Sequence, residues 1–264
     1  MITANTISND LEKIRKISPL VHNITNYVAM NNTANALLAI GASPVMAHAK
    51  EEVKDMVNIA SALVINIGTL SEKWVESMLI AAKQAKQKKI PFVFDPVGVG
   101  ATAYRTNICK QIIKEATPDI IRGNASEIMA IVKADTKTKG VDSLVSSDSA
   151  VESAKQLAMQ TNAIVSVSGE TDYITDGKEV IAIKNGSKMM PKVTGMGCTA
   201  TAITGAFAAV NDNYLMAAAN AMAIMGIAGE IAVKLSKGTG SLQMNFIDTL
   251  FNISDKEIKD RFLY

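Results

Sequence analysis

The chain has 264 residues, enough for one large α/β domain or two small ones with a sizeable core. Its 27 basic and 25 acidic residues give a net charge of +2 without any basic block, which argues against nucleic acid or an acidic membrane surface as a partner. The two cysteines, Cys109 and Cys198, are too few and too far apart for a disulfide framework or a zinc site. We therefore expect a cytoplasmic protein, and the polar residues 1–11 predict no signal peptide.

Short apolar runs alternate with helix-like segments through the first half of the chain. The pattern predicts strands at 19–24, 43–46, 62–67, 91–94 and 119–122, and helices at 25–40, 50–59, 72–87, 106–115 and 124–132. Repeated strand–helix units of this length indicate an α/β fold with a mostly parallel sheet and helices on both faces. In such sheets ligands bind beyond the carboxyl ends of the strands. Polar side chains occur near several of these ends: His22, Asn23, Asn66, Asp95 and Arg122.

The second half of the chain predicts a change in the sheet. Residues 140–149 predict a loop, 150–159 a helix and 163–167 a strand. The dipeptide Asp176-Gly177 separates two β-prone runs, which is a strong hairpin signal. We therefore expect antiparallel strands near one edge of the sheet. Because no linker is visible, we predict a single domain over residues 1–264, ending in one further helix.

One nearly uncharged segment, residues 214–233, is long enough to cross a membrane. Alanine dominates it, and alanine favours insertion much less than leucine or phenylalanine does. A helix that is small and apolar on every side fits best inside a large core. We predict a buried helix and no membrane span.

Gly195 and Gly197 precede a run of small and apolar residues and predict a loop that leads into a buried helix. The first N–H groups of a helix have no partner within it and lie at the positive end of its dipole. They can therefore bind phosphate or stabilise a negative charge in a transition state. An ordinary loop-to-helix junction explains an isolated pair of glycines at least as well.

Six motifs occur together along the chain. They are the segments 22–28 (HNITNYV), 41–46 (GASPVM), 95–100 (DPVGVG), 122–127 (RGNASE), 166–172 (SVSGETD) and 195–198 (GMGC). In this order they closely resemble the hydroxyethylthiazole kinase family, which belongs to the ribokinase-like superfamily and acts in thiamine salvage. The resemblance extends from about residue 19 to the C-terminal helices and implies a ribokinase-like fold.

The resemblance also implies a nucleotide site with a magnesium ion. Arg122, Ser168 and Gly197 would contact ATP, and a guanidinium group suits phosphate oxygens geometrically. Asp95 and Glu127 would hold Mg²⁺, mostly through water, near the phosphates of ATP. Locally, Glu127 also stands where a capping box would place an acid, and the two roles are compatible.

A thiazole site is implied beside the nucleotide. Met46 and Gly195 would line it, because a polarizable thioether can lie on an aromatic ring. Asn23, and also Asn26, would make polar contacts there. On local grounds alone, Met46 fits a core position at least as well.

Cys198 separates this chain from most of the wider superfamily, which usually has Asp at the matching position, whereas the thiazole kinases have Cys. A buried structural cysteine is the alternative interpretation. A helix N-terminus lowers the pKa of a thiol, so we expect a lowered pKa for Cys198. Because phosphoryl transfer passes through a loose transition state, a weak base suffices. The resemblance therefore implies that Cys198 is the base or orienting group, with the phosphate bound at the helix N-terminus formed by residues 195–198.

The implied reaction transfers the γ-phosphoryl group of ATP to the hydroxyl of 4-methyl-5-(2-hydroxyethyl)thiazole. The family is trimeric with sites at subunit boundaries, so the resemblance also implies a homotrimer. Two alternatives stay open. One is another ribokinase-like enzyme, such as a pyrimidine-alcohol or sugar kinase or a dehydratase of hydrated nicotinamide cofactors, for which Asp rather than Cys198 would be expected. The other is a non-catalytic thiazole or nucleotide sensor, which would need no combination of Asp95, Glu127 and Cys198.

Overall fold

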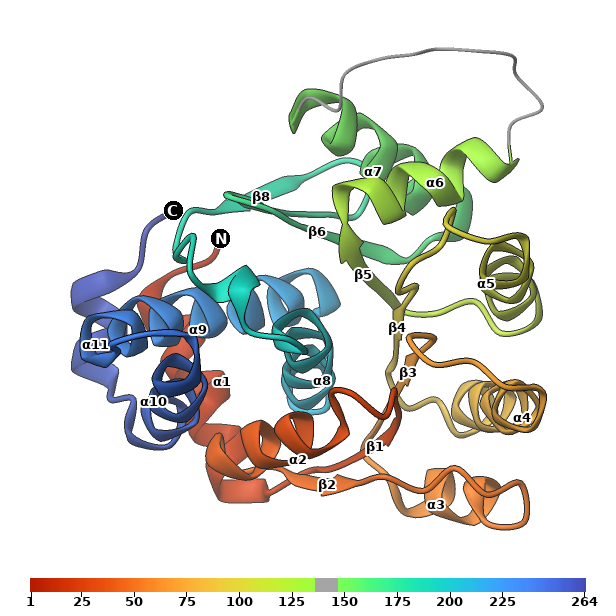
Figure 1. The fold of residues 1–264 in the computed structure, drawn as a ribbon, viewed down its shortest axis with the longest axis horizontal. Coiled ribbons are helices and arrows are strands. Elements are labelled where there is room, and N and C mark those ends of the chain that lie inside the picture. Colours follow the sequence, from red (N-terminus) through yellow and green to blue (C-terminus); the bar gives the residue numbers. More distant parts are fainter. Residues whose placement is uncertain (136–146) are drawn as a thin grey trace.

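The computed structural model describes residues 1–135 and 147–264 of the chain, and these fold around an eight-stranded sheet (Figure 1). The strands are β1 (Leu20–Ile24), β2 (Ser43–Val45), β3 (Ala62–Asn66), β4 (Phe92–Asp95), β5 (Ile120–Asn124), β6 (Ile164–Ser168), β7 (Asp172–Thr175) and β8 (Val180–Ile183). Their order is β2-β1-β3-β4-β5-β6-β7-β8. Neighbours from β2 to β6 are parallel, and β7 and β8 are antiparallel. The predicted mostly parallel sheet with an antiparallel hairpin at one edge is confirmed.

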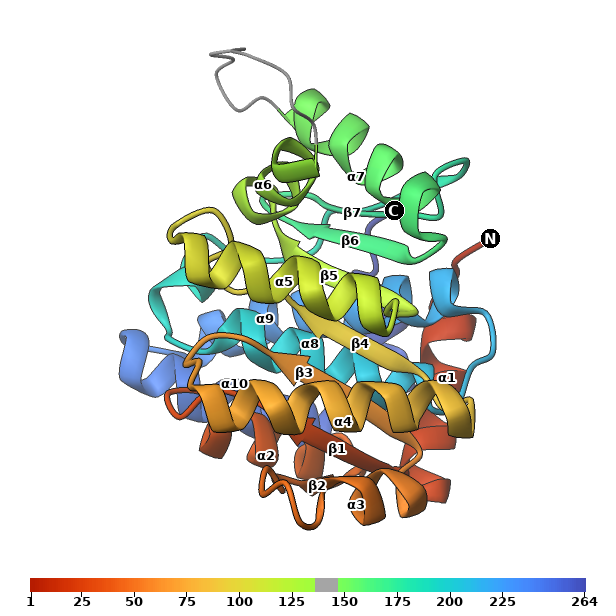
Figure 2. The same ribbon diagram turned by 90° about the vertical axis from the view of Figure 1, so that its right-hand side faces the viewer.

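Helices cover both faces of the sheet (Figures 1 and 2). One face carries α3 (Val53–Ile59), α4 (Glu72–Lys88), α5 (Ala103–Glu115), α6 (Ala125–Asp135) and α7 (Ser147–Thr161). The other carries α1 (Ala4–Ile17), α2 (Met30–Ala39), the short 3₁₀ helix η1 (Met190–Lys192), α8 (Met196–Ala208), α9 (Tyr214–Leu235), α10 (Thr239–Asn252) and α11 (Asp255–Arg261). Each face of the sheet packs into its own apolar core.

Several helix boundaries differ from the predicted ones. α3 begins at Val53 instead of residue 50, and α5 begins at Ala103 instead of residue 106 because Thr102 caps it by accepting the Arg105 N–H at 3.2 Å.

The predicted helix 25–40 begins only at Met30, because Asn26 Oδ1 accepts the Ala29 N–H at 2.9 Å and holds the preceding residues in a turn. It ends as predicted at Gly41, whose φ of +93° closes the helix. The predicted loop 140–149 lies partly outside the described residues, and α7 has already begun at Ser147.

The two ends of the chain hold helices that the pattern did not predict. α1 begins at a reciprocal capping box of Thr3 and Thr6 and packs on α9. Its buried Asp10 accepts hydrogen bonds from Asn220 in α9 at 2.8 Å and from Asn211 at 2.5 Å. The C-terminal segment forms two helices instead of one, because a second capping box starts α11.

The segment predicted to be a buried helix forms α9. Among the described residues it is the one helix long and apolar enough to cross a membrane, and 78% of its most apolar window is buried within the protein. Gly226 leaves room for the backbone of Asn185 against this helix. The prediction of a buried core helix is confirmed.

Candidate active site

The first turn of α8 lies at the carboxyl ends of the parallel strands. Gly195 is its N-cap residue with φ +79°, a conformation that glycine adopts without strain. A Cβ atom here would come within 3.2 Å of Ala29 Cβ, so the absence of a side chain also allows close packing. The helix is buried from Thr199 to Ala208. The predicted loop that leads into a buried helix is therefore confirmed.

Asp95, at the end of β4, is buried and joins two other elements. Its Oδ2 accepts hydrogen bonds from Asn66 Nδ2 of β3 at 2.7 Å and from Thr201 Oγ1 of α8 at 2.8 Å. Burial raises the pKa of Asp95 to about 6; the nearby Arg122 cation lowers it and the Glu127 carboxylate raises it. This acid is thus fixed where α8 meets the sheet.

Glu127 lies in the first turn of α6 and is held by backbone groups. Its Oε1 accepts the Gly98 N–H and its Oε2 accepts the Asn124 N–H, both at 2.8 Å. Asn124 Oδ1 in turn accepts the Glu127 N–H at 3.0 Å. The capping box is confirmed. Each carboxylate oxygen keeps a further lone pair that can bind water or a cation.

Asp95 and Glu127 suit a magnesium ion that keeps several water ligands. They do not form a site in which protein side chains supply all the ligands. In the described ranges, no group of three His, Cys, Asp or Glu side chains could hold a metal ion. The carboxylate of Glu127 is near enough to raise the pKa of Asp95. Two carboxylates, supplemented by water and phosphate oxygens, are a donor set typical of Mg²⁺.

Arg122 of β5 is buried, and among the described residues its Nε has no hydrogen-bond partner. A Cβ atom on Gly197 would lie 2.9 Å from its Nη1, so the guanidinium lies against the first turn of α8. Burial raises the pKa of Asp172, at the start of β7, to about 6, and the Arg122 charge opposes this. A buried cationic N–H without a partner is an observation that an anionic ligand would explain.

Cys198 is half-buried in the same turn, and its Sγ accepts a hydrogen bond from Asn26 Nδ2 at 3.2 Å. Burial raises the pKa of this thiol, and the charge of Asp95 raises it further. The expectation of a lowered pKa is wrong, because burial and the charge of Asp95 raise the pKa of Cys198 more than the amides of Asn26 and Asn66 and the charge of Arg122 lower it.

The candidate residues are spread along the carboxyl edge of the sheet in a definite order. Asn23 belongs to β1 and Met46 follows β2, at one end of the strand order. Arg122 and Ser168 belong to β5 and β6, beyond β4. The first turn of α8 therefore lies between the strands expected to bind substrate and those expected to bind nucleotide.

Two of these side chains each make a single hydrogen bond in the described part of the chain. Asn23 is buried; its Nδ2 donates to the Val21 carbonyl at 2.9 Å, and its Oδ1 has no partner in the described part of the chain. Ser168 Oγ donates to the Gly123 carbonyl at 3.5 Å, which is a weak interaction.

Three residues at the site escaped the sequence analysis as functional candidates: Asn66, Thr201 and Arg105. Asn66 stood at a predicted polar strand end, which was the available signal. Thr201 lies in an apolar helical run, so nothing in the sequence indicated its contact with Asp95. Arg105 donates to the carbonyls of Ile67, Val97 and Gly68 at 2.6 to 2.8 Å and holds two strand-end loops together.

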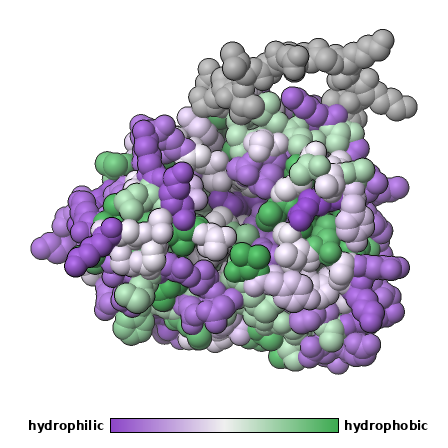
Figure 3. Space-filling view, in the orientation of Figure 1, coloured by the Kyte–Doolittle hydropathy of each residue, from purple (hydrophilic) through white to green (hydrophobic). Residues whose placement is uncertain are grey.

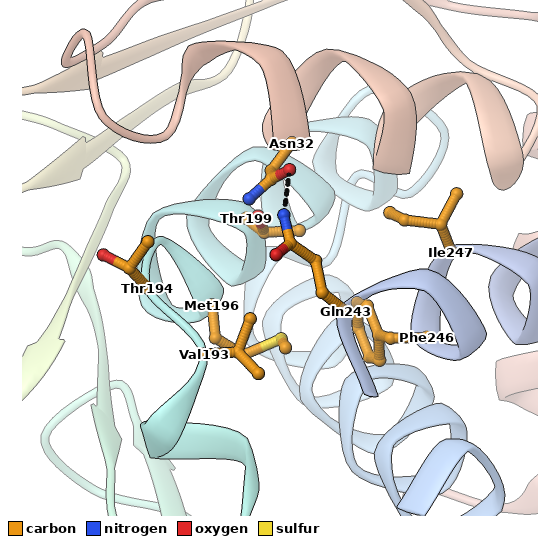
Figure 4. A pocket seen from close by; sticks show the side chains of 8 residues that line it. All are labelled: Asn32, Val193, Thr194, Met196, Thr199, Gln243, Phe246 and Ile247. Atoms are coloured by element: carbon orange, nitrogen blue, oxygen red, sulfur yellow. Dashed lines mark hydrogen bonds between the residues drawn. The ribbon is translucent and has the colours of Figure 1, made fainter. Parts of the chain in front are cut away.

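A small cavity lies behind the Gly195 turn, between α2, α8 and α10 (Figure 4). Gln243 Nε2 donates to Asn32 Oδ1 at 2.6 Å across it. Its volume of about 10 Å³ leaves room for one water molecule at most. This cavity therefore does not hold a thiazole ring.

On the face that Figure 3 shows, hydrophobic residues are scattered in small groups among hydrophilic ones.

Comparison with known proteins first identifies the class. A ribokinase-like superfamily protein from Enterococcus faecalis superposes with a TM-score of 0.67 at 12% identity, covering 98% of this chain and 96% of that chain, so the fold is ribokinase-like. A structure of hydroxyethylthiazole kinase from Pyrococcus horikoshii superposes with a TM-score of 0.92 at 40% identity, covering 98% of both chains.

The sequence comparisons identify the family. The profile of the Hydroxyethylthiazole kinase family matches residues 11–256. Hydroxyethylthiazole kinase from Syntrophus aciditrophicus is 54% identical over 95% of this chain and 93% of its own length. The one from Leptospira biflexa is 55% identical over 98% and 97%. The chain belongs to the hydroxyethylthiazole kinase family and is a kinase.

Proposed function

We propose that this chain transfers the γ-phosphoryl group of ATP to the hydroxyl of 4-methyl-5-(2-hydroxyethyl)thiazole, a step of thiamine salvage. One observation carries the proposal: the first turn of α8 brings Cys198 close to the buried Asp95 and lies against the buried Arg122. This set provides an anion site, a metal-binding acid and a thiol at one point. The alternatives, another ribokinase-like enzyme or a sensor, explain the thiol less well.

In the proposed reaction, Arg122, Ser168 and Gly197 bind ATP, and Met46, Gly195 and Asn23 frame the thiazole. Asp95 and Glu127 would hold Mg²⁺, which would neutralise charge on the phosphates. These assignments rest on the family resemblance, on the Nε of Arg122, which has no hydrogen-bond partner among the described residues, and on the paired acids.

Cys198 orients the hydroxyl, or takes its proton as the minor thiolate fraction that the raised pKa of this thiol leaves at neutral pH. The hydroxyl proton moves to Sγ, the oxygen bonds to the γ-phosphorus, and ADP leaves with the electrons of the broken P–O bond. The N–H groups of the first turn of α8, which have no partner within the helix, stabilise the charge on the transferring group.

A coupled assay of ATP consumption tests the substrate, using hydroxyethylthiazole, a pyrimidine alcohol and a pentose in parallel. We expect turnover with the thiazole alcohol. Turnover with only one of the other alcohols would overturn the substrate assignment, and binding without turnover of any of them would favour the sensor.

Replacing the thiol tests its role. We expect Cys198→Ala to lower kcat about 100-fold, the lower range for loss of a general base, and Cys198→Asp to remain active because a carboxylate can take the same proton. The control is Cys109→Ala, since Cys109 lies in the core on the other face of the sheet. A Cys198→Ala enzyme with the kcat of wild type would disprove the base role.

We also propose a cytoplasmic, single-domain chain that assembles as a homotrimer. The single sheet flanked by two cores supports one domain over the described ranges. Exposed apolar side chains on α2 and α10, namely Leu38, Met244 and Phe251, support assembly. Light scattering should give three times the 28.1 kDa of one chain, and a monomer mass would contradict the proposal.

A further inference from the structure

A chain of side-chain amides links the two reactive groups of the site. Asn66 Nδ2 donates to Asp95 Oδ2 at 2.7 Å, and Asn66 Oδ1 accepts from Asn26 Nδ2 at 2.8 Å. The same Asn26 nitrogen donates its second N–H to Cys198 Sγ at 3.2 Å. Thiol and carboxylate are thus held by one continuous hydrogen-bond path.

Backbone N–H groups fix the direction of both amides. The Ala29 N–H donates to Asn26 Oδ1 at 2.9 Å, and the Gly68 N–H donates to Asn66 Oδ1 at 2.9 Å. A backbone N–H can only donate, so each amide must present its oxygen there. The amide nitrogen of Asn26 therefore faces the sulfur, and the opposite rotamer would place two acceptors or two donors together.

The surrounding loop leaves the Asn26 amide little freedom to move. A Cβ atom on Gly68 would lie 2.7 Å from Asn26 Nδ2, so the backbone at Gly68 packs directly on the amide. Arg105 in turn holds this backbone by donating to the carbonyls of Ile67 at 2.6 Å and Gly68 at 2.8 Å. The amide is pre-oriented before any ligand binds.

We propose that Asn26, supported by Asn66, is the positioning residue for Cys198: its N–H keeps the sulfur as an acceptor and stabilises the thiolate. A hydrogen bond to the charged form of a group favours that form. The charge of Asp95 disfavours the thiolate and the charge of Arg122 favours it. These are the charged groups that face the thiol. The inference rests on the proposed part of Cys198 in the reaction.

The test is the rate of Cys198 alkylation by iodoacetamide between pH 6 and 10, followed by peptide mass spectrometry on the full chain without ligands. Asn26→Asp keeps the shape and the acceptor for the Ala29 N–H but replaces the N–H at the sulfur by a carboxylate, whose charge also disfavours the thiolate, so the uncharged Asn26→Ser is measured beside it. We expect alkylation at pH 7.5 to slow about 10-fold, the size of one charged hydrogen bond. We also expect kcat to fall while KM for ATP stays within about two-fold of wild type.

Asn35→Asp is the matched control, since this exposed residue of α2 donates only to Asn31 Oδ1 at 3.0 Å in the described structure. It should keep the wild-type alkylation profile. If Asn26→Asp does not fold, Asn26→Ser, which removes the same N–H with a smaller side chain, carries the test alone.

An unchanged alkylation profile in the Asn26 variants would overturn the proposal, even if kcat fell, because a purely structural defect would leave the thiol pKa in place. The two hypotheses fail separately. Full activity of Cys198→Ala would disprove the base role, whereas alkylation measures the sulfur and its amide directly.

Discussion

At the residue scale, the site depends on a missing side chain as much as on those present. Gly197 is the second residue of α8, and the space where its Cβ would lie is next to Arg122 Nη1. Gly240 is the second residue of α10, and no atom of the described residues lies within 4 Å of the place for its Cβ. The two glycines thus occupy the same helical position in opposite surroundings.

We predict that Gly197→Ala raises KM for ATP about 10-fold, because the new methyl group displaces the guanidinium from its place beside the helix N-terminus, and one charged hydrogen bond has about that value. Gly240→Ala should leave KM unchanged, since alanine is a better helix former than glycine and meets no neighbour. Steady-state kinetics at saturating thiazole alcohol measures both. Equal KM values for the two variants would show that Arg122 does not need this space.

The same scale shows what the sequence could and could not predict about the site. The pattern placed Asp95 and Arg122 at strand ends, where any parallel sheet gathers polar groups, and only the family resemblance implied that they bind metal and nucleotide. The contact between Asn26 and Cys198 joins residues 172 positions apart and depends on the tertiary fold. The pKa shift of Cys198 was predicted in the wrong direction, because a sequence does not reveal how far the fold buries a thiol.

At the element scale, the periodic segments were predicted well and the exceptions have local causes. The strands were all predicted because short apolar runs bounded by turn residues fit few other structures. α1 was missed although Ile7, Leu11 and Ile14 recur at the i, i+4, i+7 spacing of an amphipathic helix; these few apolar residues stand in an otherwise polar segment. α2 begins further along the chain than predicted, because the side chain of Asn26 accepts the Ala29 N–H and holds a turn there. The same turn orients the Asn26 amide nitrogen toward Cys198.

The packing of α9 gives a prediction about two of its glycines. A Cβ on Gly226 would overlap the backbone of Asn185, which resists displacement because its side chain donates to Glu230 at 3.0 Å and to the Arg261 carbonyl at 2.8 Å. A Cβ on Gly229 would overlap only the flexible side chain of Met190.

We therefore expect Gly226→Ala to lower the free energy of unfolding by about 3 kcal/mol, the upper range for overpacking, and Gly229→Ala by about 1 kcal/mol or less. Urea unfolding followed by circular dichroism measures both values. Equal losses would mean that the segment around Asn185 adjusts as easily as a methionine side chain.

At the scale of the whole molecule, buried titratable groups act on stability in opposite directions. Burial lowers the pKa of His22, while a hydrogen bond to the Ala47 carbonyl at 2.7 Å and the charge of Glu52 partly oppose it. Burial raises the pKa of Asp95 and of Asp172 to about 6. The contribution of the two carboxyls to the free energy of unfolding therefore declines as the pH rises from about 4 to 6. The contribution of His22 declines as the pH falls below about 6.5.

The contribution of His22 can be isolated with one variant. A carbonyl only accepts, so Nε2 carries the proton, and Nδ1 has no partner among the described residues that could accept a second one. Protonation is thus costly in the folded state, and the stability that His22 provides is complete above its unfolded pKa and declines as the pH falls through the folded value.

His22→Gln keeps an N–H for the Ala47 carbonyl and removes the titration. We expect the difference in unfolding free energy between wild type and His22→Gln to shrink between pH 7.5 and 5, by at most about 1.4 kcal/mol per pH unit for one proton. Urea titrations at each pH measure it, and a difference independent of pH would mean that His22 accepts its second proton in the fold without cost.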